Sequence, residues 1–310
     1  MTTLEARAPA TTLAELEPLR RRARRRRMAV LTLKRIAIIV VILLTLAPGY
    51  WIVLASIAPG DAFFGVSLIP TDVTFANYTD LIADTDFLTW VKNSMIVSTS
   101  VAALSTLATA LAAYAFSRLR FWGRRYGLMV MLLVQMFPIG VALPAYFYLL
   151  LWLGDHFSPG GRTIVGLNTL QGVILVLAGG GVAFYAWLFK GYLDNMPIEL
   201  EEAAFVDGAT RLQTLRYVLF PLVRPIIAVV FLFLFIGTYS EYLLTSLIIF
   251  DDPSKNTLPL GLNGFIFNQF AQHWTQFAAA AVVGSIPLLV VFMLMQRYLV
   301  AGLARGAVKG

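Results

Sequence analysis

The chain has 310 residues, of which 59% are hydrophobic and only 13% are charged, and its mean hydropathy is +0.77. A soluble globular domain carries about 25% charged residues, so this composition excludes an ordinary soluble protein. Cysteine is absent, which excludes disulfides, thiol nucleophiles and thiolate metal sites. The two histidines, His156 and His273, lie far apart in the sequence and offer no metal-ligand spacing, so we expect no metal site.

Apolar residues come in long runs that are separated by polar segments. A run of about 20 residues is the length that a helix needs to cross the hydrocarbon core of a bilayer, which is about 30 Å thick. The pattern therefore predicts an all-α, polytopic membrane protein with six transmembrane helices. The predicted spans are residues 36–58, 90–116, 126–153, 169–189, 225–250 and 277–300.

The first 35 residues are polar and strongly basic. The segment from Thr11 to Arg26 is compatible with a surface helix beside anionic lipid, and a nucleic-acid-binding arm is the less favoured interpretation of the same charges. The apolar run that follows is longer than the roughly 7–15 residues of a secretory signal, and no A-x-A-like cleavage site comes after it. We therefore expect a retained span behind a basic tail, residues 1–35.

The distribution of basic residues predicts the orientation of the chain. Only Lys92, Arg162 and Lys255 of the 24 lysines and arginines fall on the side assigned as outer, and residues 59–89 have several aspartates but no basic residue. Lysine and arginine are enriched in loops that stay in the cytoplasm. We therefore expect both termini to be cytoplasmic, together with the loop 190–224 and the tail 301–310. The net charge of +7 then reflects orientation, and we expect no nucleic-acid partner.

Several chemical functions are excluded by missing motifs. The sequence has no G-x-x-x-x-G-K-[ST] loop, so we expect no nucleotide site in this chain. It also has no H-E-x-x-H or G-x-S-x-G site. The ionisable residue at membrane depth, Glu241, has no histidine or lysine in its own span. These observations predict a protein that is not an enzyme, with no catalytic residues and no cofactor of its own.

Prolines and glycines mark the expected bends. Pro138 and Pro144 should kink the third span, and the run Gly179–Gly181 should let the fourth span flex or pack closely. In the loop 190–224, Pro197 suits the first turn of a helix, and Gly208 suits a left-handed cap at its end. The same loop then predicts a second short helix: Thr210 caps it, and it runs from Arg211 to about Phe220 and stops at Pro221.

This loop resembles a known motif. Glu202-Ala203-Ala204, then Gly208 after three residues, then Val218-Leu219-Phe220-Pro221 after nine more, is similar to the E-A-A-x3-G-x9-I-x-L-P loop of binding-protein-dependent ABC importer permeases. The chain departs from that pattern at Val218 and Phe220, which are both apolar replacements. The resemblance implies an ABC type I importer permease fold and a loop that docks on an ATPase. The coupling residues that it implies, with the flanking acidic residues, are Glu201, Glu202, Ala203, Ala204, Asp207, Gly208 and Pro221.

Further short motifs resemble carbohydrate permeases of this class, and maltose/maltodextrin permeases in particular. They are Phe75-Ala76-Asn77-Tyr78, Asn93-Ser94, Tyr114-Ala115-Phe116-Ser117-Arg118, Gln135-Met136-Phe137-Pro138, Gly166-Leu167-Asn168-Thr169, Lys190-Gly191-Tyr192, Phe277-Ala278-Ala279-Ala280-Ala281 and Val308-Lys309-Gly310.

The resemblance implies a set of partners and a location. The partners would be a second permease chain, two ATPase subunits that carry ATP and magnesium, and an extracytoplasmic sugar-binding protein. The location would be a bacterial inner membrane. Maltose or maltodextrin is the favoured substrate, and trehalose or another oligosaccharide is the alternative.

Glu241, with Tyr239 and Tyr242, is the candidate for a substrate pathway, because an ionisable group at membrane depth is costly and usually functional. A hydrogen bond within the helix bundle would explain the same residue. Two other classes of function remain open. One is an ion-coupled carrier that works alone with Glu241 as its coupling carboxylate, and the other is a membrane scaffold without transport.

Overall fold

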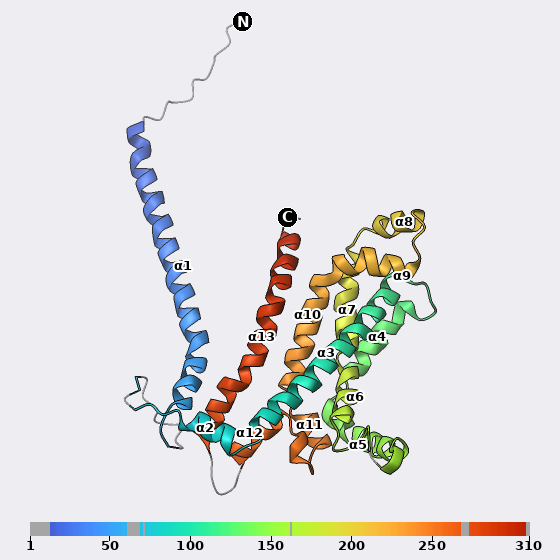
Figure 1. Cartoon of the computed structure of the whole chain (residues 1–310). Coiled ribbons are helices and arrows are strands. Elements are labelled where there is room, and N and C mark those ends of the chain that lie inside the picture. The colour runs from blue at the N-terminus through green and yellow to red at the C-terminus, as the bar shows by residue number, and fades with distance from the viewer. Residues whose placement is uncertain (1–12, 61–68, 71, 162, 268–272, 308–310) are drawn as a thin grey trace. The chain divides into compact units, whose positions relative to one another are not determined.

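The computed structural model describes residues 13–60, 69–70, 72–161, 163–267 and 273–307, and in these ranges every regular element is a helix (Figure 1). The chain divides into two compact units, residues 1–54 and 55–310. The principal helices of the second unit are α2 (Ala76–Ala83), α3 (Phe87–Arg118), α4 (Arg124–Gln135), α5 (Ile139–His156), α6 (Leu170–Gly180), α7 (Val182–Asp194), α8 (Glu199–Val206), α9 (Arg211–Gln213), α10 (Phe220–Tyr239), α11 (Leu243–Ile248), α12 (Leu258–Phe267) and α13 (Trp274–Ala307).

The first unit is built on α1 (Leu13–Ser56), a continuous helix of 44 residues. From Arg26 to Tyr50 its side chains are exposed on every face, although most of those from Ile36 onward are apolar. A helix that is apolar all round is typical of a membrane span. The helix has no break at Arg26, so the basic segment before it and the apolar run after it are continuous.

Four helices of the described chain are long and apolar enough to cross a membrane by themselves, and two bent pairs bring the possible number to six. The pair α4 and α5 is bent by 93°, and the pair α6 and α7 by 46°. The second bend falls at Gly181, within the glycine run where the sequence predicted flexibility. At the first bend Met136–Pro138 are not helical, because proline cannot donate the next helical hydrogen bond. The segment predicted as the third span is therefore two helices with a sharp break between them, rather than one kinked helix.

One side chain joins the two bends. The amide of Gln135, the last residue of α4, donates to the carbonyl of Gly180 at 2.6 Å and accepts from the N–H of Phe184 at 3.0 Å. The carbonyl belongs to the last turn of α6 and the N–H to the first turn of α7, and such groups have no partner inside their own helix. Gln135 therefore satisfies the backbone where α6 breaks into α7.

Helix α3 is at the centre of the second unit, where it packs against α6, α7 and α10 (Figure 1). Its contact faces are rich in small residues, so that neighbouring backbones can approach closely in lipid. Ala102 and Ala113 are fully buried, and Ser105 donates to the carbonyl of Ala178 at 2.6 Å. Val230 and Phe235 of α10 fill the same core.

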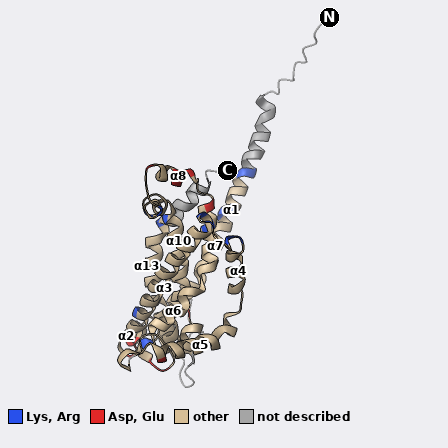
Figure 2. Cartoon of the chain, turned by 90° about the vertical axis from the view of Figure 1, so that its right-hand side faces the viewer, with Lys and Arg blue, Asp and Glu red and all other residues tan. Residues whose placement is uncertain are grey.

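Two boundaries differ from the sequence prediction. The helix of the fifth span ends at Tyr239 rather than at residue 250, and the chain then breaks before α11. The segment 251–276, predicted as a polar loop, contains α12, whose Leu258 is buried. Charged residues of the second unit gather at the end that carries α8 and at the opposite end, near α2 and α5, and the band between them is largely uncharged (Figure 2).

Candidate functional site

The loop between α7 and α10 contains the residues that the sequence singled out. Gly208 has φ +84°, as expected for a left-handed cap. The N–H of Ala209 bonds to the carbonyl of Ala204 and that of Gly208 to the carbonyl of Phe205, which together close a complete Schellman motif. The cap prediction is confirmed. Pro197 is not in the first turn of α8, because it precedes Ile198, which is the N-cap.

The second part of the loop begins as predicted and ends differently. The Thr210 hydroxyl and the Gln213 side chain form a reciprocal capping box over α9. The helix does not stop at Pro221, since a π-helical segment, Thr214–Leu219, leads directly into α10. The wider turn lets the N–H of Phe220 reach the carbonyl of Leu215, which relieves the clash that proline makes in an α-helix. The end of the loop is thus joined to α10 without an interruption of the helix.

A buried ion pair ties the loop to α3. Arg118, the last residue of α3, donates from Nε to a carboxylate oxygen of Glu201 at 2.5 Å, and the two side chains are only 10% and 5% exposed. The same guanidinium donates to the carbonyls of Leu193 and Met196 at 3.0 and 3.3 Å and to the hydroxyl of Ser117 at 3.2 Å. One side chain therefore holds the end of α3, the end of α7 and the start of α8 together.

A second set of polar contacts surrounds this pair. The Ser117 hydroxyl donates to Asp194 at 2.6 Å, and Lys190 forms an ion pair with the same carboxylate. The guanidinium of Arg124 donates to the carbonyls of Phe116 and Ser117 at 2.9 and 2.6 Å, which satisfies the final turn of α3. Contacts between helix ends thus fix the base on which α8 rests.

The predicted coupling residues divide between two faces of the loop. Glu201 and Ala204 point inward and are buried, whereas Glu202, Ala203, Asp207, Gly208 and Pro221 are exposed. The same loop also exposes two apolar side chains that sequence reasoning missed, Val206, which is 88% exposed, and Leu212, which is 72% exposed. Exposed apolar side chains next to unpaired carboxylates are suited to a protein partner with a basic rim and an apolar socket.

The candidate pathway residues are not gathered at one point. Glu241 lies in the break after α10, where its carboxylate accepts from the N–H groups of Leu244 and Thr245 at 2.7 and 2.9 Å and from the Thr245 hydroxyl at 2.7 Å. These bonds cap α11. Tyr239 is buried and donates to the carbonyl of Gly284 at 2.8 Å, and Tyr242 is 38% exposed. The bonds account for the Glu241 carboxylate without a substrate, and a role in the pathway stays a prediction.

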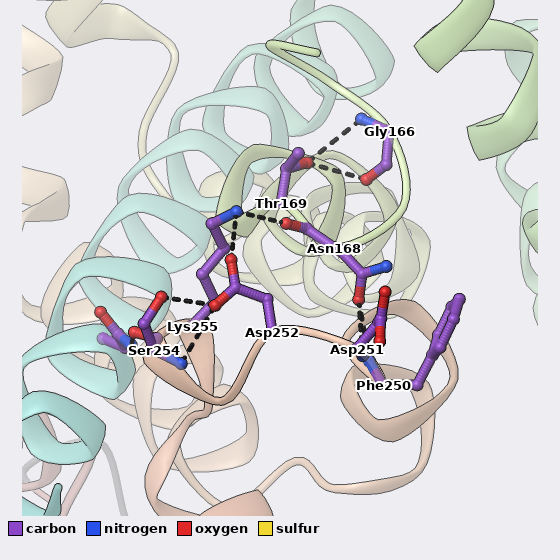
Figure 3. Close-up of polar contacts among 9 residues, drawn as sticks. Gly166, Asn168, Thr169, Phe250, Asp251, Asp252, Ser254 and Lys255 are labelled. Carbon is purple, nitrogen blue, oxygen red and sulfur yellow. Dashed lines mark hydrogen bonds and ion pairs between the residues drawn. The ribbon is translucent and has the colours of Figure 1, made fainter. Parts of the chain in front are cut away.

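At the opposite end of the unit, Asn168 joins the segment before α6 to the segment after α11 (Figure 3). Its φ is +53°, and its side-chain oxygen accepts from the N–H groups of Phe250 and Asp251 at 3.0 and 3.1 Å. Lys255 donates to the Asn168 carbonyl at 2.8 Å and pairs with Asp252 at 2.8 Å. Hydrogen bonds from Lys255 and then Ser254 hold the pKa of Asp252 below its ordinary value. The motif Gly166–Thr169 thus has a structural role.

Among the described residues, no group of three or more His, Asp or Glu side chains is arranged to hold a metal ion.

Comparison with known proteins gives a consistent picture. Residues 105–305 match the family described as binding-protein-dependent transport system inner membrane component. The galactooligosaccharides transport system permease protein GanQ of Bacillus subtilis (strain 168) is 36% identical over 85% of this chain and 90% of its own length. The maltose/maltodextrin transport system permease protein MalG of Vibrio vulnificus (strain YJ016) is 42% identical over 72% of this chain and 73% of its own.

The fold is similar to that of a solved structure, a bacterial ABC transporter involved in the import of the acidic polysaccharide alginate. The TM-score is 0.70 at 22% identity, over 94% of this chain and all of that chain. The matching relatives are membrane permease subunits rather than enzymes, in agreement with the sequence prediction. The chain is a multi-pass membrane protein and belongs to the family of binding-protein-dependent transport system inner membrane components.

Proposed function

We propose that this chain is the permease subunit of an ATP-driven, binding-protein-dependent sugar importer, and that the loop 190–224 couples it to an ATPase. The observation that carries this proposal is the division of the loop into two faces. Glu201 is buried against Arg118, while Glu202, Val206 and Asp207 are exposed on the other side of the same short helix. A helix anchored on one face and open on the other is suited to receive a partner and pass its movement inward.

In this scheme the sugar never meets the loop. Closure of two ATPase subunits, which hold ATP and magnesium, moves α8 as a rigid body. The ion pair of Arg118 with Glu201 carries the displacement to α3, and the continuous π-helical connection carries it to α10. A second permease chain completes the pathway, and an extracytoplasmic binding protein delivers the sugar. The loop and both termini lie on the cytoplasmic side of the inner membrane.

For the substrate, we propose a maltodextrin as first choice, because the maltose/maltodextrin relatives have the higher identity. A galacto-oligosaccharide is the second choice, since the galactooligosaccharide relative matches over more of the chain. The ligand preference of the cognate binding protein decides between them. A binding protein that takes a peptide or an inorganic anion would contradict the sugar assignment.

The test of the coupling role uses three matched variants in the assembled transporter. Gly208→Val should abolish ATP-dependent sugar uptake while the chain still inserts, because a β-branched residue at φ +84° is strained. Gly208→Asn should keep most of the uptake, because asparagine tolerates the left-handed region. Gly191→Ala, at a helical glycine with open space around it, is the neutral control. Full uptake by Gly208→Val would overturn the assignment.

An ion-coupled carrier that works alone is the second candidate. It would need Glu241 to exchange a proton or cation, yet the Glu241 carboxylate already accepts three hydrogen bonds that cap α11. The purified chain, reconstituted alone in vesicles with an ion gradient, should transport no sugar. Gradient-driven uptake by the chain alone would establish the carrier instead.

A further inference from the structure

The short connection between α3 and α4 forms a basic and aromatic hollow that the coupling role does not use. A cavity of about 960 Å³ opens there, lined among others by Phe121, Trp122, Arg124, Arg125 and Tyr126. The connection joins the end of one membrane-spanning helix to the start of a bent pair. It must therefore lie close to the boundary between lipid and water.

The aromatic side chains of this connection are largely exposed, and such exposure of apolar surface is unfavourable in water. Trp122 is 99% exposed, Tyr126 is 60% exposed and Phe121 is 44% exposed. Tryptophan and tyrosine are enriched at the level of lipid headgroups, where the apolar part of the ring contacts lipid and its polar group contacts water. These side chains are thus placed to enter the lipid interface beside the cavity.

The cavity is also positively charged, and no carboxylate occurs among its described lining residues. Arg124 is fixed by the carbonyls of Phe116 and Ser117, which engage its Nε and one terminal nitrogen. Arg125 is exposed, with its guanidinium 5.4 Å from the centre of the Tyr126 ring. Lys190 lines the same cavity, although it also forms an ion pair with Asp194. Two arginines also stand in the first turn of α4, where the helix dipole disfavours cations, so an anion in the cavity would relieve an unfavourable arrangement.

We propose that this hollow binds the headgroup of an anionic phospholipid. The phosphate pairs with Arg125 and with the remaining terminal nitrogen of Arg124, and Trp122 and Phe121 pack against the glycerol and upper acyl region. A lipid fits better than a free anion because the phosphate-binding cations and the exposed aromatic rings share one cavity, and only a lipid headgroup brings both a charge and an apolar chain to it. The site is independent of which sugar is transported and of how the ATPase docks.

The test is fluorescence quenching of the full-length chain in lipid nanodiscs. The signal of Trp122 is the difference between the wild-type chain and Trp122→Phe. The quencher is phosphatidylglycerol or phosphatidylcholine, brominated high on the acyl chains and present at the same mole fraction. Brominated phosphatidylglycerol should quench the Trp122 signal more strongly than brominated phosphatidylcholine. Inorganic phosphate at millimolar concentration should not abolish the preference.

Two charge variants make the test specific. Arg125→Gln should reduce the apparent preference for phosphatidylglycerol about fivefold, because the phosphate loses a cation that it contacts directly. Arg120→Gln removes the same charge from an exposed residue of the same connection that does not line the cavity, and it should leave the preference unchanged. Circular dichroism and gel filtration of each variant check that the fold is retained.

Three results would overturn the proposal. Equal quenching by the two lipids would show that no anionic headgroup is selected. An equal loss in Arg120→Gln and Arg125→Gln would show only a diffuse surface charge. Protection of Trp122 from both quenchers when ATPase subunits are added would show that the connection is a protein contact.

Discussion

The ion pair between Arg118 and Glu201 offers a sharp test of how α8 is held. Glu201→Gln removes the negative charge and leaves a guanidinium that is only 10% exposed and has neutral acceptors alone, the new amide oxygen among them. Removing one partner of a buried pair costs about 3–5 kcal/mol, because an uncompensated charge stays buried. At the lower end of that range, opening of α8 becomes about a hundredfold more frequent, since 1.36 kcal/mol corresponds to a factor of ten.

Hydrogen exchange of the amides in Glu199–Val206 measures this opening directly. Glu201→Gln should speed exchange there by about two orders of magnitude, while exchange in the core of α3, near Ala102, stays slow. The apolar double variant Arg118→Met with Glu201→Leu leaves no buried charge and should recover most of the protection. It should still transport less sugar per ATP hydrolysed, because a flexible apolar contact transmits force less rigidly than a bonded pair.

Either of two results would refute this reasoning. Exchange of α8 in Glu201→Gln within a factor of three of wild type would show that the pair contributes little to holding the helix. A double variant with full protection and full transport per ATP would show that the pair is structural and has no part in coupling.

Three further predictions follow from the polar contacts. Gln135→Leu should lower the melting temperature in detergent, because the Gly180 carbonyl and the Phe184 N–H lose their partner at a cost of about 1–3 kcal/mol each. Gln135→Glu keeps only the acceptor, so its melting temperature should lie between those of the wild type and Gln135→Leu. Equal melting temperatures of all three chains would contradict the bridging role. The pKa of Asp252 is lowered chiefly by the hydrogen bond from Lys255. The stabilisation that the Asp252 carboxylate gives should therefore be fully present above its ordinary pKa of 3.8, and it should be lost as the pH falls through the lowered pKa of the folded state. The difference in melting temperature between wild type and Asp252→Asn should therefore be constant at neutral pH and vanish in acid below that range, and a difference that disappears already near pH 6 would be inconsistent with this pair. Glu241→Gln keeps an acceptor for the cap of α11 and should retain most sugar uptake, whereas Glu241→Ala should lose stability by about 1 kcal/mol. Loss of uptake in Glu241→Gln at unchanged stability would instead support a role of Glu241 in the substrate pathway.

The sequence predicted those features of the fold that depend on local chemistry. Length and apolar runs predicted long apolar helices, the glycine run indicated the bend between α6 and α7, and Gly208 predicted a left-handed cap. Each of these follows from the backbone preferences of one short stretch. They needed no knowledge of what packs beside it.

Features that depend on distant segments were not predicted. Glu201 and Glu202 are adjacent and chemically identical, yet α8 turns one toward Arg118 at the end of α3 and leaves the other exposed. Pro221 was read as a helix stop because proline breaks an α-helix, yet a π-helical turn accommodates it. The bridging role of Gln135 was not predicted, since the two groups that it bridges belong to another bend.

The most direct test of the coupling proposal asks what touches α8. A photo-crosslinking amino acid replaces Val206, which is 88% exposed, and in a matched chain it replaces Phe250, which is 62% exposed near the opposite end of the second unit. Both chains are irradiated in membranes that contain the assembled transporter. The account predicts a crosslink from position 206 to an ATPase subunit and none from position 250. A crosslink to the ATPase from position 250, or its absence from position 206 in a transporter that still imports sugar, would contradict it.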